Sequence, residues 1–191
     1  FGHEVTNLCA VRLVETPATF VRNYRVQLKP GTTNQIEATV QLDGPALRQH
    51  VVLSLPGTGL TAAVDTDGTG AARIELAVPG LELWSPEKPR LYEVALSTPG
   101  DRIAEKIGFR SIAVHGTDIL LNGRPVFLRG VSLHEENPLR GGRAWSEADD
   151  RLLLGWAPAL GCNFVRLAHY PHNEHMARLA DELGLMLWEE I

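Results

Sequence analysis

The sequence is poor in cysteine, in aromatic residues and in long hydrophobic runs. Cys9 and Cys162 are the only cysteines among 191 residues, and they fall in segments assigned below to different domains. We expect both to be unpaired core thiols, which supply no metal site and do not distinguish one cellular compartment from another. No apolar run is long enough to cross a membrane, so no membrane partner is expected.

The chain also has no excess of positive charge. Lys and Arg number 18 against 23 Asp and Glu, which gives a formal net charge of −5. Without a clustered basic stripe, a nucleic-acid partner is not expected. An initiator methionine and a signal peptide are absent too, and Ile191 stands at the end of an apolar run. We therefore expect the chain to be a piece of a longer protein.

The first 112 residues have the rhythm of short β-strands. Ile36, Ala38, Val40 and Leu42 alternate with polar residues, which is the period of a half-buried strand. Asp67-Gly68 predicts a tight hairpin between two strands. Seven runs at this spacing predict an antiparallel β-sandwich of immunoglobulin type, although the Cys…Trp…Cys core of antibody domains is absent. The predicted strands span residues 11–14, 20–28, 36–42, 51–55, 72–78, 92–96 and 103–112.

Within the predicted sandwich, Trp84 and Tyr92 flank a stretch with two prolines. Prolines restrict the backbone, so a rigid loop with both aromatic rings packed as core anchors is the favoured interpretation. The alternative is an aromatic surface on which a sugar stacks.

After residue 112 the pattern changes to strands alternating with helices. A small hairpin should turn at Asn122-Gly123, Ser146 should cap a helix that Pro158 breaks or kinks, and Gly184 should cap a second helix. The apolar strands predict a parallel β-α-β-α-β unit, the start of a TIM-type (β/α)8 barrel. The predicted elements are strands 126–133, 163–168 and 185–188, and helices 146–154 and 173–183.

Polar residues follow each of these three strands. His134 and Glu135, then Arg166 and His169, then Glu189 and Glu190 stand at the ends that would converge on one rim of a barrel. Such a rim suits a polyhydroxylated ligand, because each hydroxyl both donates and accepts. A purely structural role for each of these residues stays open. Each His could be hydrogen-bonded within the fold, Arg166 could simply pair with Glu189 or Glu190, and Glu135, Glu136 and Glu147 could form a solvated loop.

Several motifs together make the chain resemble glycoside hydrolase family 2, the β-galactosidase, β-glucuronidase and β-mannosidase group. Their order and spacing are specific, and they cover nearly the whole chain. They lie at residues 83–86, 108–110, 121–125, 128–130, 134–135, 163–171 and 181–184.

The resemblance implies a modular retaining β-glycosidase, most simply a β-galactosidase, with a β-glucuronidase or β-mannosidase as the alternative. This chain would contain the immunoglobulin-like module, residues 1–112, and the first three strands of the catalytic barrel, residues 113–191. Family members use two glutamates from later barrel strands, so no catalytic residue is expected here and the chain alone should be inactive. A non-catalytic carbohydrate-binding or scaffolding module is the rival interpretation.

The same resemblance implies roles for four residues. His134 and His169 would contact sugar hydroxyls, Arg166 would orient the region of the catalytic carboxylate, and Glu190 would support the rim or a cation. No cofactor and no metal ligand is expected within the chain, and a structural or activating cation in the parent enzyme stays open. The partner is a carbohydrate substrate. Because three strands cannot close a barrel, self-association through the exposed strand edges is also expected.

Overall fold

The computed structural model describes residues 13–190. Cys9 lies outside this range, so the expectation that it is unpaired is not addressed, whereas Cys162 is free and half-buried. The strand predicted over residues 11–14 is wrong where the chain is described, since Leu13 and Val14 form no strand and are exposed. None of the helices in residues 13–190 is both long and apolar enough to cross a membrane.

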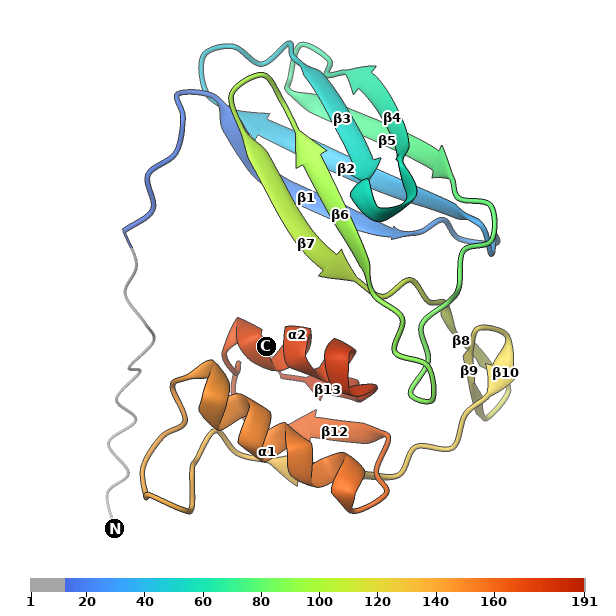
Figure 1. Ribbon diagram of the computed structural model, residues 1–191, viewed down its shortest axis with the longest axis vertical. Coiled ribbons are helices and arrows are strands. Elements are labelled where there is room, and N and C mark those ends of the chain that lie inside the picture. The colour runs from blue at the N-terminus through green and yellow to red at the C-terminus, as the bar shows by residue number, and fades with distance from the viewer. Residues whose placement is uncertain (1–12, 191) are drawn as a thin grey trace. The chain divides into compact units, whose positions relative to one another are not determined.

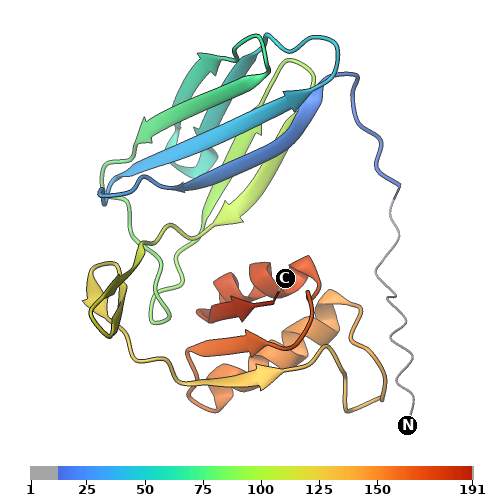
Figure 2. The same cartoon turned by 180° about the vertical axis from the view of Figure 1, so that it is seen from behind.

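Seven antiparallel strands form a β-sandwich, as the sequence predicts. One sheet has the order β1-β2-β5 and the other β4-β3-β6-β7, and Figure 2 shows the first sheet in front of the second. Period-two alternation explains this, because each strand turns alternate residues inward. The strands are β1 (Phe20–Leu28), β2 (Gln35–Asp43), β3 (His50–Leu55), β4 (Leu60–Asp65), β5 (Ala71–Ala77), β6 (Tyr92–Ser97) and β7 (Arg102–Ile107), and the 3-10 turn Pro56–Thr58 follows β3.

The core of the sandwich lies between the two sheets. Ile36 and Leu53 have no exposed surface, and Tyr92, which belongs to the same core, is 8% exposed. Trp84 is also fully buried, outside this core, and its ring Nε1 donates to the Asp181 carbonyl at 2.8 Å. The packed-anchor interpretation of Trp84 and Tyr92 is therefore right, and the sugar-stacking alternative is wrong because no ring face is open.

The hairpin predicted at Asp67-Gly68 is wrong. The strand before it, β4, was missed from the sequence, and β4 and β5 belong to different sheets, so this connection crosses the sandwich. Asp67 accepts hydrogen bonds from the Thr69 and Ala71 amides at 2.8 and 3.0 Å, and the left-handed residue is Gly70 with φ 82°. β4 was missed because it is an edge strand in which no residue is fully buried and the central inward-facing residue is Ala62.

A small three-stranded sheet follows, with the order β10-β9-β8. Its strands are β8 (Ile112–His115), β9 (Asp118–Leu121) and β10 (Arg124–Pro125). The predicted turn between β9 and β10 is confirmed: Asn122 and Gly123 have φ values of 52° and 77°, which suit a hairpin turn that only such residues adopt easily.

The last part of the chain is a parallel sheet of three strands with two helices, as predicted. The sheet has the order β11-β12-β13, and Figure 2 shows its strands in front of α1. This is the start of a (β/α)8 barrel, built from β-α-β units with crossover helices. Its elements are β11 (Gly130–Leu133), α1 (Glu147–Ala159), β12 (Phe164–Leu167), α2 (Glu174–Leu183) and β13 (Met186–Glu189).

Two details of this part differ from the prediction. β11 begins at Gly130 rather than at Val126, because the Val126 amide bonds to the Ile119 carbonyl and so extends the preceding hairpin. α1 continues through Pro158, which lies in its last turn. A proline removes only one backbone bond there, and the amides of Gly161 and Cys162 satisfy carbonyls of that turn.

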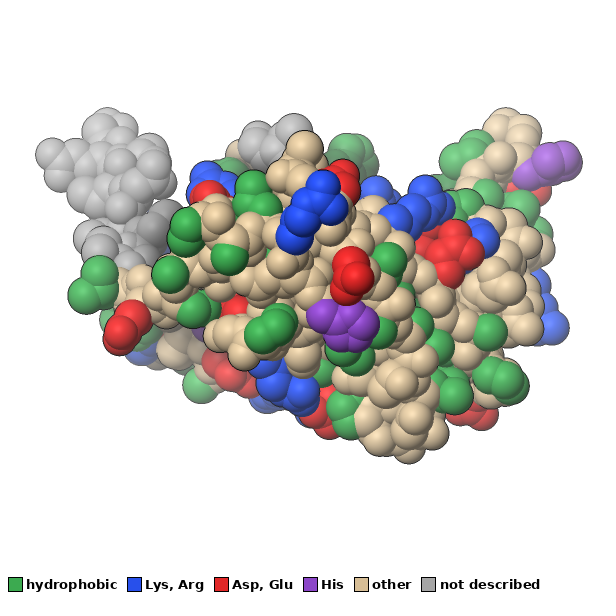
Figure 3. Space-filling view, turned by 90° about the horizontal axis from the view of Figure 1, so that it is seen from above, with side chains coloured by type: hydrophobic (Ala, Val, Ile, Leu, Met, Phe, Trp, Pro, Cys, Tyr) green, Lys and Arg blue, Asp and Glu red, His purple; other side chains and the backbone are tan. Residues whose placement is uncertain are grey.

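The chain divides into two compact units. Within the described residues, one holds Thr16–Leu128 with Asp181–Gly184, and the other holds Arg129–Ala180 with residues 13–15 and 185–190. The predicted domain boundary at residue 112 and the predicted self-association stay predictions. On the face that Figure 3 shows, basic and acidic side chains are mixed rather than gathered by sign.

We predict that Gly130→Ala weakens the parallel sheet. A Cβ at this position would lie 2.5 Å from the Phe164 carbonyl oxygen on the neighbouring strand and closer still to the Phe164 ring. Relieving that overlap must move β11 away from β12, at a cost of about 1–3 kcal/mol. Faster hydrogen exchange in β11 and β12 would be the readout.

Gly155→Ala is the matched control. Gly155 lies within α1, and an added Cβ would meet nothing within 4 Å. Since alanine is favoured over glycine in a helix by about 1 kcal/mol, this variant should be more stable than the unmodified chain. Equal destabilisation by both substitutions would contradict a steric origin of the effect.

Candidate functional site

The candidate site lies at the carboxyl ends of three adjacent parallel strands. In register, Leu133 of β11 pairs with Leu167 of β12, and Leu167 pairs with Glu189 of β13. The residues that follow are therefore brought to one edge of the sheet, as the sequence predicts. We call His134, Arg166, His169 and Glu190 the rim cluster.

The two histidines of the rim cluster are in contact. Their ring centroids lie 5.1 Å apart in an edge-to-face arrangement, and the Tyr170 ring lies 6.2 Å from His134. His169 follows Ala168 through a cis peptide bond. Both histidines are exposed, so neither is part of a packed core.

Arg166 links His169 to Glu190. Its Nε donates to a carboxylate oxygen of Glu190 at 3.0 Å, and Nη2 lies 2.7 Å from the same oxygen in an ion pair and 3.2 Å from Nδ1 of His169. A guanidinium can only donate, so Nδ1 of His169 must be the acceptor and its proton must be on Nε2. His169 therefore presents an N–H donor. The pairing of Arg166 with Glu190 that the sequence left open is also present.

Glu135 differs from both of its predicted interpretations, because its carboxylate is neither on the open rim nor in a solvated loop. The residue is 2% exposed. One oxygen accepts from Nε and Nη2 of Arg143 at 3.0 and 2.7 Å, and the other accepts from the Asn173 amide at 2.5 Å. Glu135 thus ties the loop after β11 to the segment before α2. Glu136 is exposed in the loop, as that interpretation requires, whereas Glu147 is exposed but is the first residue of α1.

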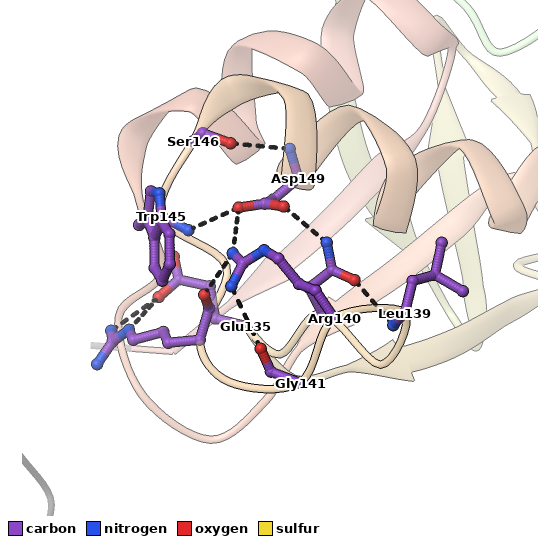
Figure 4. A network of polar contacts seen from close by, with 9 residues as sticks. Glu135, Leu139, Arg140, Gly141, Trp145, Ser146 and Asp149 are labelled. Carbon is purple, nitrogen blue, oxygen red and sulfur yellow. Dashed lines mark hydrogen bonds and ion pairs between the residues drawn. The ribbon is translucent and has the colours of Figure 1, made fainter.

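The loop between β11 and α1 is organised by Asp149, as Figure 4 shows. Its carboxylate accepts from Asn137 at 2.7 Å, from Arg140 at 2.6 Å and from the Trp145 amide at 3.2 Å. These hydrogen bonds, led by that of Arg140, hold the pKa of Asp149 far below its ordinary value. Ser146 caps α1 as predicted, accepting from the Asp149 amide at 3.2 Å.

Asp150, the next residue, has the opposite environment. It has no exposed surface, and within residues 13–190 neither of its carboxylate oxygens has a hydrogen-bond partner. Burial, followed by the negative charges of Glu135, Asp149 and Glu147, raises the pKa of Asp150 from 3.8 to about 6.

Sequence reasoning missed two residues of this region, Tyr170 and Arg143. The Tyr170 hydroxyl accepts from the Glu135 amide at 3.1 Å, and the Arg143 guanidinium lies 5.5 Å from the Tyr170 ring centre. Tyr170 stands directly after His169, so its position beside a predicted site residue was a usable signal. Arg143 follows Gly141 and Gly142, and nothing in their spacing indicates that the loop returns to Glu135.

Other features of the described chain do not supply a competing site. A hollow of about 790 Å³ lies on the β1-β2-β5 sheet, and its lining includes Tyr24, Arg25 and Arg73 but no residue of the rim cluster. Among residues 13–190, no group of three or more His, Cys, Asp or Glu side chains is placed to hold a metal ion. The rim cluster therefore remains the candidate site.

Comparison with known proteins gives two family matches. Residues 15–110 match the model described as "Glycosyl hydrolases family 2", and residues 112–191 match "Glycosyl hydrolases family 2, TIM barrel domain". Among curated proteins, the chain is 37% identical to a β-galactosidase of Arthrobacter sp. (strain B7) over 134 residues, 70% of this chain and 13% of that protein. It is 31% identical to the β-glucuronidase of Rattus norvegicus over 194 residues, 95% of this chain and 29% of that protein.

Comparison with solved structures also gives matches. The chain is similar to an FMN-binding β-glucuronidase from Facaelibacterium prausnitzii L2-6, with a TM-score of 0.76 and 30% identity over 92% of this chain and 30% of that one. It is also similar to a β-galacturonidase from Eisenbergiella tayi bound to galacturonate, with a TM-score of 0.74 and 28% identity over 92% of this chain and 33% of that one. The chain thus spans a third or less of the length of these relatives.

Proposed function

The chain belongs to family 2 of the glycosyl hydrolases, and on that premise we propose that it is part of a retaining β-glycosidase that hydrolyses terminal β-linked sugars. In this proposal residues 1–112 are the immunoglobulin-like module and residues 113–191 are the start of the catalytic barrel. The observation that carries it is the rim cluster: four polar side chains from three successive strands, joined by contacts at the barrel edge where catalysis takes place in this architecture.

Each residue of the rim cluster has a role in the proposal. His134 and His169 bind sugar hydroxyls, and the N–H at Nε2 of His169 is the donor. Arg166 holds His169 and Glu190 in place through its two contacts. This division is typical of sites in which a few fixed polar groups orient a polyhydroxylated ligand.

A neutral β-galactoside is the substrate that we favour. The positive charge of Arg166 is already compensated by Glu190, with 2.7 Å between Nη2 and the carboxylate oxygen. A uronic acid would bring a second carboxylate to that pair, which costs free energy unless another cation is supplied. A β-glucuronidase is the second candidate, supported by relatives that cover 94–95% of the chain.

The hydrolytic carboxylates themselves are expected outside this chain. Retaining hydrolysis needs an acid/base and a nucleophile roughly 5 Å apart on either side of one glycosidic bond. Glu189 and Glu190 are neighbours at the end of an extended strand, so their side chains are expected on opposite faces. Glu135 is buried against Arg143, and Glu190 is paired with Arg166. We therefore expect none of these three carboxylates to belong to the hydrolytic pair.

We predict that His169→Ala in the whole enzyme lowers kcat/KM on an aryl β-galactoside about 10- to 100-fold, because it removes one sugar-orienting hydrogen bond worth roughly 1–3 kcal/mol. The isolated chain should show no turnover. Initial rates on aryl β-galactoside, β-glucuronide and β-mannoside would measure both effects and rank the three sugars.

His50→Ala is the control for this experiment. His50 lies on β3 in the sandwich and pairs with Asp65 at 2.8 Å in an exposed position, so its loss should leave the rates within about twofold. A whole enzyme that is indifferent to His169→Ala would remove the proposed role of the rim. Turnover by the isolated chain would show that the hydrolytic carboxylates lie within it.

A further inference from the structure

A large exposed aromatic side chain with no role assigned so far lies on the loop that follows β11 and His134. Trp145 lies in the loop between β11 and α1, and it is 67% exposed. Tryptophan is usually well buried, so a solvent-facing ring on a loop at the catalytic edge of a barrel is unusual and points to a ligand.

The loop holds this ring in a fixed position. The Trp145 amide donates to Asp149 at 3.2 Å, and the preceding residue, Ala144, donates its amide to the Glu135 carbonyl at 2.9 Å. Trp145 is therefore anchored on both sides, to the first turn of α1 and to the residue that follows His134. Figure 4 shows the indole standing at the edge of this network.

One face of the indole is covered from within the loop. The guanidinium carbon of Arg140 lies 3.8 Å from the ring centre, and Arg140 itself is fixed by Asp149 at 2.6 Å and by the Arg143 carbonyl at 2.8 Å. Because the Arg140 guanidinium covers one face of the Trp145 indole, a ligand can stack on the other face. The same contact restrains the indole before a ligand binds.

The position of Trp145 in the chain relative to the rim cluster indicates which part of a ligand would contact the indole ring. Trp145 is joined to the strand end through Ala144 and Glu135, and Arg143 of the same loop lies against Tyr170, which is next to His134. In the proposed function the rim cluster supplies the polar groups that bind sugar hydroxyls, whereas Trp145 offers a flat apolar surface on the loop that begins directly after His134. Such a surface suits the less polar group on the far side of the scissile bond.

We propose that Trp145, backed by Arg140, is the stacking surface of an aglycone subsite, which takes the aromatic ring or the apolar face of the second sugar of a β-glycoside. This inference rests on the proposed glycosidase function and adds a specificity-determining residue to it. The subsite would favour substrates with a cyclic leaving group over those without one.

The test compares two kinds of substrate in the whole enzyme. An aryl β-galactoside and a β-linked disaccharide place a ring in the subsite, whereas β-galactosyl fluoride has the same glycone and no ring beyond the scissile bond. Trp145→Ala should lower kcat/KM on the first two about tenfold, in line with the energy of a ring contact, and leave the fluoride within about twofold. Trp145→Phe should retain most of the activity on all three.

Controls separate stacking from folding. Trp145→Leu keeps apolar bulk without the ring face, so it should reproduce the selective loss even if the alanine variant folds poorly. Trp156→Ala removes another partly exposed tryptophan, one that lies on α1, and should not change the ratio between substrates.

The outcomes are distinct. An equal loss on the fluoride and the aryl glycoside, or no loss on either, would overturn the subsite while leaving the glycosidase function in place. An unmodified whole enzyme that hydrolyses neither β-glycosides nor glycosyl fluorides would overturn the proposed function and the subsite with it.

Discussion

Glu135→Ala should unfold the region around β11 at a cost of about 3–5 kcal/mol, the range seen when one partner of a buried ion pair is removed. The Glu135 side chain is 3% exposed and receives two hydrogen bonds from Arg143 and one from the Asn173 amide. Alanine would leave the Arg143 guanidinium, whose side chain is 30% exposed, and the half-buried Asn173 amide without their acceptor. Both the loop before α1 and the start of α2 should loosen.

Hydrogen exchange of the whole chain is the appropriate measurement, since a chain with two compact units does not have a single unfolding free energy. Glu135→Gln should be intermediate, because the amide oxygen can still accept from Asn173 while the charge opposite Arg143 is lost.

Glu136→Ala provides a matched control for the same loop. Glu136 is adjacent in sequence and exposed, so its removal should change local stability by no more than about 0.5 kcal/mol. If the two alanine variants exchange alike, the Glu135 bridge does not hold this region together.

The fold was largely predictable from the sequence because its signals are periodic and local. Ile36 and its alternate neighbours specify a strand with one buried face, and Asn122-Gly123 specifies a turn, whatever the rest of the chain does. The connection at Asp67-Gly68 failed for a different reason. Asp67-Gly68 can form either the turn of a hairpin or part of a connection between two sheets. Which of the two forms depends on the strand that pairs with β4.

The rim cluster was predictable because parallel strands place their carboxyl ends together. Strand assignment places His134, Arg166, His169 and Glu190 at the strand ends, the family resemblance selects these four, and the structure brings them into contact. The contacts of Glu135 were not predictable. They depend on the loop reversing at Gly141 and Gly142, both with positive φ, to return Arg143 to the strand end.

The opposite environments of Asp149 and Asp150 could not be predicted from the sequence. These residues are adjacent acids in the first turn of α1, where either would be read as favourable to the helix dipole. Asp149 points into a set of donors, whereas Asp150, one position on, points into a site without any. The difference of about 100° around the helix decides which acid is stabilised.

We predict that Asp150→Ala stabilises the barrel part of the chain at neutral pH. The folded-state pKa of Asp150 is about 6 against an ordinary 3.8, so ionising it in the folded state costs about 3 kcal/mol at about 1.4 kcal/mol per pKa unit. Alanine removes the buried charge and both oxygens that lack partners. Asp150→Asn should gain less, since its amide is equally deprived of partners.

The pH dependence gives the sign of the effect. Because the pKa of Asp150 is higher in the folded state than in the unfolded state, the folded state holds its proton between about pH 4 and 6 while the unfolded state loses it. Stability therefore falls as pH rises through this window and is constant above it. The advantage of Asp150→Ala should be full above about pH 6 and should vanish below about pH 4.

Asp149→Ala should behave in the opposite way, and this pair forms the decisive comparison. The pKa of Asp149 is lowered by Arg140 and Asn137, so its contribution to stability is present above its ordinary pKa and is lost only as pH falls well below it. Removing it should free the loop that carries Trp145 and destabilise α1 at about pH 7, where Asp150→Ala stabilises it. Hydrogen exchange of α1 at about pH 5 and about pH 7.5 would measure both. If the two alanine variants changed α1 in the same direction at the higher pH, Asp150 could not be an uncompensated buried charge.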